Sequence, residues 1–236
     1  MLFKDIFFKE NVLFIHIPKN AGTSIEKSIY NTNWLVGHTP AIRYFKEDEN
    51  KFLSLKSFAF VRNPYDRFIS AFFYLKDGGA MRGSDLEFYY FIKDTSFSEF
   101  CFNILNNEEY KNKVLSHIHF REQYKFVCNA KKEIIVNFIG KYEKIAADFL
   151  LFTKIYLNKN IFLPHLNRSK HEEYLKYYQE NEVKAVNALY KEDFLKFNYK
   201  MLDENHFATG GGVLMFKLTV IALFALEQIL LMGGGN

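Results

Sequence analysis

The segment His16–Ser24, with the sequence HIPKNAGTS, contains residue types that bind anions. Lys19 precedes Gly22, and the hydroxyl residues Thr23 and Ser24 follow it. Backbone N–H groups at a helix N-terminus favour a phosphate, hydroxyl groups add donors, and a lysine adds positive charge. In the triphosphatase loop GxxxxGK[ST] the lysine instead follows the second glycine. The segment therefore predicts an anion site of a different type, with an ordinary capped strand–turn–helix as the alternative.

A second group of such residues lies in residues 58–72, with the sequence FAFVRNPYDRFISAF. Arg62 ends an apolar run, and Ser70 lies two turns into the helix predicted to follow. A guanidinium and a hydroxyl at this position could hold a second phosphate at the same edge of a sheet. Two anion sites on neighbouring strand ends predict a nucleotide that carries separated phosphate groups.

Strand–helix units in series are expected to position these residues. Short apolar runs at Val12–Ile17, Ser57–Val61 and Ile134–Ile139 predict buried strands, and a helical pattern follows each run. Asn63 can cap the second of these helices, and Pro64 suits its first position. The series predicts an α/β fold, P-loop-like and three-layered, with a central, mostly parallel sheet flanked by helices.

The rest of the folded chain is expected to be mainly helical. Residues 77–129 predict helices with loops that shape a substrate site. Ser169 and Glu172 have capping-box spacing, which predicts an amphipathic helix that continues to Tyr190. Residues 1–205 are therefore predicted to form one domain.

Residues 206–236 form a glycine-flanked apolar tail of uncertain role. Glycine triplets border residues 213–232, a mostly apolar stretch long enough to span a bilayer. Lys217 and Glu227 within it would make a span costly. Membrane association, association as a helix and an appended segment all stay open for this tail.

Composition excludes several classes of protein. The net charge of +4 is scattered without a dense basic block, which suits one polyanionic ligand better than a nucleic acid. Cys101 and Cys128 lie outside any zinc motif, and His117 and His119 lack a third ligand, so no metal is predicted. Charged residues interrupt the apolar pattern of residues 1–17, and the few cysteines agree with a cytoplasmic location.

The motifs resemble those of the carbohydrate sulfotransferase type 2 family. Residues 16–24 resemble its 5′-phosphosulfate loop, and residues 58–72 resemble its 3′-phosphate motif. Residues 137–149 are similar to a later strand and helix of the family, and residues 163–169 to a late loop. The resemblance covers roughly residues 12–202 and leaves the tail outside.

The resemblance implies a donor, 3′-phosphoadenosine 5′-phosphosulfate (PAPS), and in-line transfer of its sulfuryl group to a hydroxyl of a glycan or glycoside, without a metal. Lys19 would stabilise charge on the leaving phosphate and the transferring oxygens. For Arg168, Ser169 and Lys170, a helix cap or a solvated turn is an equally good explanation. The residues implied for the donor are Lys19, Asn20, Ala21, Gly22, Thr23 and Ser24 at the 5′ end, Arg62 and Ser70 at the 3′-phosphate, and Arg168, Ser169 and Lys170 closing over it.

A base must accept the proton of the hydroxyl, and histidine is the first candidate because imidazole titrates near neutral pH. His38, in VGHTP (36–40), resembles the catalytic histidine of the heparan sulfate 2-O-sulfotransferase branch and would contact the acceptor. A loop-stabilising role is the alternative for His38, and Glu26 and Glu47 are the alternative bases. His16 is expected to make a local hydrogen bond, with its side chain directed away from the donor.

Residues 119–123, HFREQ, resemble a family segment in which proline is usual at the position of Glu122. His119, Arg121 and Gln123 are therefore candidates for contacting the acceptor, with a structural network as the equal alternative. Two other functions compete with sulfuryl transfer. A nucleoside phosphate kinase or hydrolase is opposed by the displaced lysine. A non-catalytic nucleotide- or glycan-binding module is opposed by the complete set of donor and base candidates.

Overall fold

The computed structural model describes residues 1–32, 35–163 and 173–203. Its sheet contains three parallel strands in the order β1–β2–β3, so the second apolar run supplies the central strand. The strands are β1 (Val12–Ile15), β2 (Lys56–Val61) and β3 (Phe138–Lys141). Every residue of β1 is buried, and so are all but the first of β2, which is the pattern of strands covered on both faces.

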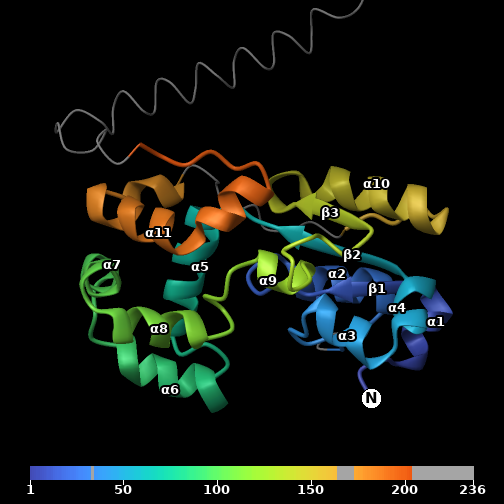
Figure 1. The fold of residues 1–236 in the computed structure, drawn as a ribbon, viewed down its shortest axis with the longest axis horizontal. Helices are drawn as coiled ribbons and strands as arrows, with labels where there is room; N and C mark the ends of the chain where they lie inside the picture. The colour runs from blue at the N-terminus through green and yellow to red at the C-terminus, as the bar shows by residue number, and fades with distance from the viewer. Residues whose placement is uncertain (33–34, 164–172, 204–236) are drawn as a thin grey trace, which may run out of the picture.

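Helices connect the strands and cover the sheet. The helices around the sheet are α1 (Asp5–Glu10), α2 (Gly22–Tyr30), α3 (Ala41–Glu47), α4 (Glu49–Ser54), α9 (Tyr124–Val127), the 3₁₀ turn η1 (Tyr142–Lys144) and α10 (Ile145–Leu157). Figure 1 shows α10 on one side of the sheet and α3 and α9 on the other. The predicted α/β fold with a parallel sheet between helical layers is confirmed.

A second group of helices packs beside the sheet, and Figure 1 shows it as a separate half of the molecule. Its members are α5 (Pro64–Lys76), α6 (Gly83–Ile92), α7 (Phe97–Asn106), α8 (Glu108–Ser116), the 3₁₀ helix η2 (Glu173–Tyr177) and α11 (Glu180–Lys196). The prediction that residues 77–129 are helical with loops is confirmed. As predicted, the side chain of Asn63 accepts a hydrogen bond from an N–H of the first turn of α5, and Pro64 is the first residue of this helix.

Several predicted boundaries were wrong, and the first strand, for example, ends at Ile15 rather than at Ile17. The third strand begins at Phe138 because Ile134 forms an isolated antiparallel bridge with Cys128 before the chain joins the sheet. The predicted late helix is interrupted: a 3₁₀ helix ends at Tyr177, and Gln179 starts α11 with a capping box of its own. The capping box predicted at residues 169–172, like the tail, lies outside the described residues.

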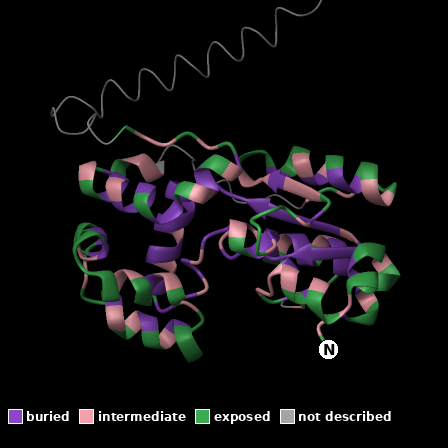
Figure 2. Ribbon diagram, in the orientation of Figure 1, coloured by how far each residue is buried: buried purple, intermediate pink, exposed green. Residues whose placement is uncertain are grey.

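The buried side chains form two clusters, one around the sheet and one among α5, α6, α7, α8 and α11. Figure 2 shows buried residues concentrated along the strands and on the inward faces of these helices. In the first cluster, the ring of Phe58 on β2 stacks on Phe152 of α10, with 4.1 Å between ring centroids. Within the described parts of the chain, no helix is long and apolar enough to cross a membrane.

Candidate active site

The loop between β1 and α2 makes two left-handed turns before the helix begins. Lys19 has φ 69° and Ala21 has φ 59°, values in a backbone region that residues other than glycine seldom adopt. No side chain caps α2, and in the described residues the amides of Gly22 and Thr23 have no hydrogen-bond acceptor. The start of α2 therefore presents free N–H groups and the positive end of its dipole.

Position 22 has no room for a side chain, because the ring of His16 lies against it. A Cβ atom at this position would lie 1.9 Å from Nε2 of His16. The imidazole of His16 therefore occupies the space over the first turn of α2, and the ring contributes to the wall of a cavity. The expected local hydrogen bond is present, because His16 Nδ1 lies 2.8 Å from Glu26 Oε1. The His16 ring lines the cavity, and its expected direction away from the donor stays a prediction.

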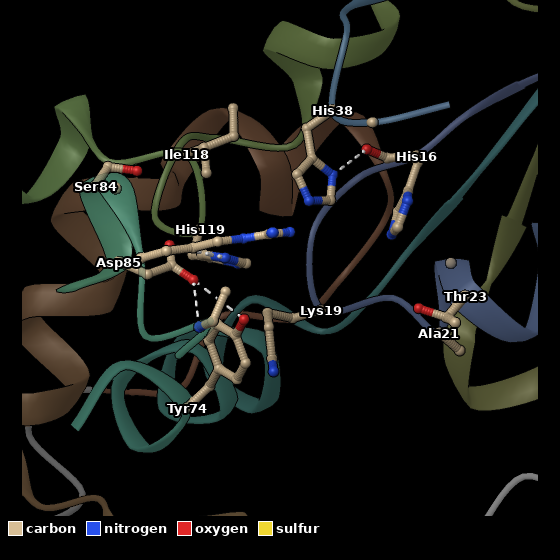
Figure 3. Close-up of a pocket in the computed structure, with 15 residues that line it drawn as sticks. His16, Lys19, Ala21, Thr23, His38, Tyr74, Ser84, Asp85, Ile118 and His119 are labelled. Atoms are coloured by element: carbon tan, nitrogen blue, oxygen red, sulfur yellow. Dashed lines mark hydrogen bonds and ion pairs between the residues drawn. The ribbon is translucent and has the colours of Figure 1, made fainter. Parts of the chain in front are cut away.

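A cavity of about 700 Å³ opens at the end of this loop, a volume typical of ligand sites. Figure 3 shows Lys19, His38 and Thr23 facing it from the β1–α2 side. The opposite wall comes from α5, from the start of α6 and from the segment before α9. Its polar residues include Tyr74, Ser84, Asp85 and His119.

The ammonium group of Lys19 lies inside this cavity. Its Nζ is 3.9 Å from the centroid of the Tyr74 ring, and no hydrogen bond or ion pair reaches it from the described residues. Burial lowers the pKa of Lys19 to about 8, the Arg62 guanidinium acts in the same direction, and the Asp85 carboxylate opposes them. Lys19 is therefore mostly charged at neutral pH and free to bind an anion.

His38 is held by the backbone of the first strand end. Its Nδ1 lies 3.0 Å from the carbonyl oxygen of His16, so Nδ1 carries the proton and donates it to this bond. The Nε2 atom of a neutral His38 is then a hydrogen-bond acceptor. Burial lowers the pKa of His38 to about 4, helped by neighbouring His16. His38 is thus unprotonated at neutral pH, as a general base must be.

Glu26 holds the chain segment that leads to His38. Its Oε2 accepts hydrogen bonds from the amides of Leu35 (2.6 Å) and Val36 (3.3 Å), and its Oε1 contacts His16. Burial alone would raise the pKa of Glu26, but these hydrogen bonds outweigh it and lower the pKa. Glu26 is 1% exposed and does not line the cavity, so its carboxylate serves the backbone of the loop.

Asp85 organises the opposite wall. Its Oδ2 accepts hydrogen bonds from Tyr74 Oη (3.1 Å) and from the Ala80 amide (3.0 Å). Its Oδ1 lies 3.3 Å from Nε2 of His117 and 3.7 Å from Nε2 of His119. Burial lowers the pKa of both histidines, to about 2 for His119, so both rings are neutral beside this carboxylate. Among the described residues, no group of three or more side chains could hold a metal ion.

Arg62 lies at the end of β2 with its guanidinium fixed on three sides. Nε and Nη2 donate to the two carboxylate oxygens of Asp66, each at 2.8 Å, and Nη1 donates to the carbonyl oxygen of Lys19 at 2.9 Å. The Tyr142 ring lies 4.2 Å from its central carbon. Arg62 therefore connects the end of β2 to the β1–α2 loop, as its predicted place on the neighbouring strand end requires.

Comparison with protein families identifies the family of the chain. Residues 5–200 match the Sulfotransferase family, so the match includes all three strands and the whole cavity. The chain belongs to the sulfotransferase family. Neither the curated proteins nor the solved structures include a significant match. The chain is therefore an enzyme of sulfuryl transfer, and the resemblance of its two motifs to sulfotransferase motifs is confirmed at the level of the family.

The cavity of this sulfotransferase brings together several residues singled out in the sequence. Lys19, Ala21, Gly22, Thr23, His38 and His119 all line it. Ser24 and Ser70 are half-buried and lie outside its lining, as does Arg62. Glu47 is exposed and accepts a hydrogen bond from the Leu2 amide, away from the site. Arg168, Ser169 and Lys170 lie outside the described residues.

Two of the predicted residues have side chains engaged in the interior. The amide group of Asn20 donates to the carbonyl oxygen of Phe60 (2.6 Å) and to Gln123 Oε1 (3.0 Å). Gln123 is 0% exposed, accepts from the Arg62 amide and donates to the Arg62 carbonyl oxygen. For Gln123 these contacts form the structural network that was the alternative to acceptor binding. Arg121 is half-buried and does not line the cavity.

Three residues around the cavity, Tyr74, Asp85 and Arg67, were not predicted from the sequence. Arg67 is 1% exposed and donates to the carbonyl oxygens of Pro18 (3.2 Å), His119 (3.1 Å) and Arg121 (2.8 Å), so it joins the two walls of the cavity. The available signal for Arg67 was a charged residue directly before the apolar pair Phe68 and Ile69 near the start of α5. For Tyr74 and Asp85 no local pattern existed, because Lys19, His117 and His119, which complete their surroundings, come from distant segments.

Proposed function

We propose that this sulfotransferase uses PAPS as donor and transfers its sulfuryl group to a carbohydrate hydroxyl. One observation carries the proposal: the free ammonium of Lys19 and the uncapped start of α2 share a cavity with His38, whose Nε2 is available to accept a proton. The anion-binding groups and the base therefore lie on one wall of a single site, at separate positions along it.

The residues fit the 5′ end of this donor. The free amides of Gly22 and Thr23, the exposed side chain of Thr23 and the unpaired ammonium of Lys19 are all hydrogen-bond donors without a partner among the described residues. Donors of this kind at a helix N-terminus favour a phosphate or sulfate group. The donor supplies an activated sulfuryl group when it is bound.

Arg62 fits a second phosphate only in part. A guanidinium has five N–H groups, and Arg62 uses three of them on other described residues, two on Asp66 and one on the Lys19 carbonyl oxygen. One N–H on each terminal nitrogen therefore stays available for a 3′-phosphate. Because Asp66 fixes the plane of the group, these two donors are pre-oriented.

In the proposed reaction, His38 Nε2 accepts the proton of the acceptor hydroxyl as the hydroxyl oxygen bonds to sulfur and the bond from sulfur to the phosphate oxygen breaks, so that adenosine 3′,5′-bisphosphate leaves. The Nδ1 bond to the His16 carbonyl oxygen stabilises the ring in this tautomer and in the protonated state that follows. Lys19 and the α2 amides stabilise negative charge on the transferring group and on the leaving phosphate. The buried wall around Asp85 and His119 orients the acceptor and excludes water.

The test combines binding and transfer. Calorimetry should show that adenosine 3′,5′-bisphosphate binds more tightly than ATP with magnesium, and a glycan screen with PAPS should detect a sulfated product by its mass. Lys19→Ala should abolish transfer without unfolding the protein, whereas Lys27→Ala, at an exposed position of α2, should keep it. Full transfer by Lys19→Ala, or preference for ATP, would reject the proposal.

A further inference from the structure

Tyr74 stands out among the residues that the family motifs do not include. It lies on the third turn of α5, faces the cavity and contacts groups from three other segments (Figure 3). The Lys19 ammonium lies 3.9 Å from its ring centroid on one side, and the His119 ring centroid lies 4.9 Å away. Its hydroxyl donates to Asp85 Oδ2. The position of the Tyr74 ring is thus fixed by the hydrogen bond of its hydroxyl and by the side chains of Lys19 and His119.

The Lys19 ammonium depends on this ring because it receives no hydrogen bond or ion pair from the described residues. Ammonium groups are attracted to the face of an aromatic ring, and more strongly when water is excluded. Around Lys19, the Arg62 guanidinium repels the charge, the Asp85 carboxylate attracts it, and His119 is neutral. The Tyr74 ring itself is a neutral phenol, since burial and Asp85 raise its pKa to about 12.

We propose that Tyr74 is a positioning residue, which holds the Lys19 side chain in its charged form over its ring before the donor binds. The inference rests on the proposed function in assigning a catalytic role to Lys19. A flexible lysine side chain has many rotamers, and an ordered cation loses less entropy when it meets the phosphosulfate group. Asp85 contributes by fixing the tyrosine hydroxyl.

The proposal predicts how Lys19 titrates, and this can be measured without donor or acceptor. Lysine labelled with ¹³C at Cε would be titrated by NMR, with the Lys19 signal assigned from its loss in Lys19→Arg. Tyr74→Leu should lower the pKa of Lys19 by about one pH unit, because the cation–π attraction is gone. Tyr74→Phe keeps the ring and should lower it by less than half as much.

The matched control is Phe73→Leu, which removes the neighbouring aromatic ring of α5, where Phe73 packs against Phe72 and Tyr177 instead. It should leave the Lys19 pKa unchanged. If thermal melting shows that Tyr74→Leu does not fold, Tyr74→Met replaces it. An unchanged or raised Lys19 pKa in the Leu or Met variant, or equal shifts for Phe and Leu, would overturn the proposal. Because no turnover is measured, this result is independent of whether PAPS is the donor.

Discussion

The chemistry of His38 is determined by one hydrogen bond. Because Nδ1 donates to the His16 carbonyl oxygen, Nε2 is the nitrogen that can accept a proton. Replacing His38 by Ala should lower turnover by roughly 10²–10⁴-fold, the usual effect of losing a general base, while affinity for adenosine 3′,5′-bisphosphate persists. Turnover and calorimetry on the same preparation would check this. Near-normal turnover would instead favour the loop-stabilising role for His38.

The charge of Lys19 predicts how anion binding depends on pH. Its pKa is lowered to about 8, so the ammonium is present below pH 8 and is lost as the pH rises through that value. Affinity for adenosine 3′,5′-bisphosphate should therefore be constant near pH 7 and fall between about pH 8 and 9.5. In Lys19→Arg the guanidinium stays charged, so this decline should disappear. A decline that persists in Lys19→Arg would assign it to another group.

At the scale of elements, the start of α2 depends on a fit between Gly22 and His16. An alanine at position 22 would place its Cβ 1.9 Å from the imidazole, so either the ring or the helix must shift. Gly22→Ala should destabilise the fold by about 1–3 kcal/mol, as overpacking does, and weaken anion binding. Urea unfolding would measure the first effect and calorimetry the second.

The same pair provides the control. His16→Ala removes the ring that the new methyl group would meet. In this background, Gly22→Ala should cost less than about 0.5 kcal/mol, because alanine is otherwise well tolerated in a helix. Equal costs of Gly22→Ala in both backgrounds would show that the glycine is needed for another reason, such as the backbone conformation at Ala21.

Local sequence patterns predicted β1 and α2, the elements that carry the half of the site proposed to bind the donor. The loop from His16 to Ser24 is contiguous, so its residues stay together in any strand–turn–helix, and Asn63 and Pro64 mark the start of α5. The wall around Asp85 was not predictable in this way. It forms because α6 brings Asp85 next to His117 and His119, residues more than thirty positions away, and no local pattern encodes that contact.

At the scale of the molecule, the series of apolar runs along the chain predicted the α/β class. It did not predict how the two hydrophobic clusters are joined. The buried polar residues Arg67, Gln123 and Asp193 make that connection. Asp193 of α11 accepts hydrogen bonds from the amides of Gln123 and Tyr124 at the start of α9. From the sequence alone such residues are predicted to be exposed, since charged side chains are rarely buried.

Replacing Arg67 is the strongest test of this connection, because its side chain donates hydrogen bonds to three carbonyl oxygens from both walls of the cavity. Arg67→Met keeps much of the volume but leaves these carbonyl oxygens without their donor, which should lower the free energy of unfolding by about 2–5 kcal/mol. Arg43→Met, on the exposed face of α3, should change the free energy of unfolding by less than about 0.5 kcal/mol.

Because the Pro18 carbonyl belongs to the loop that carries Lys19, Arg67→Met should also weaken binding of adenosine 3′,5′-bisphosphate. Urea unfolding and calorimetry test both effects, and a loss below about 1 kcal/mol with unchanged binding would show that packing alone joins the two halves.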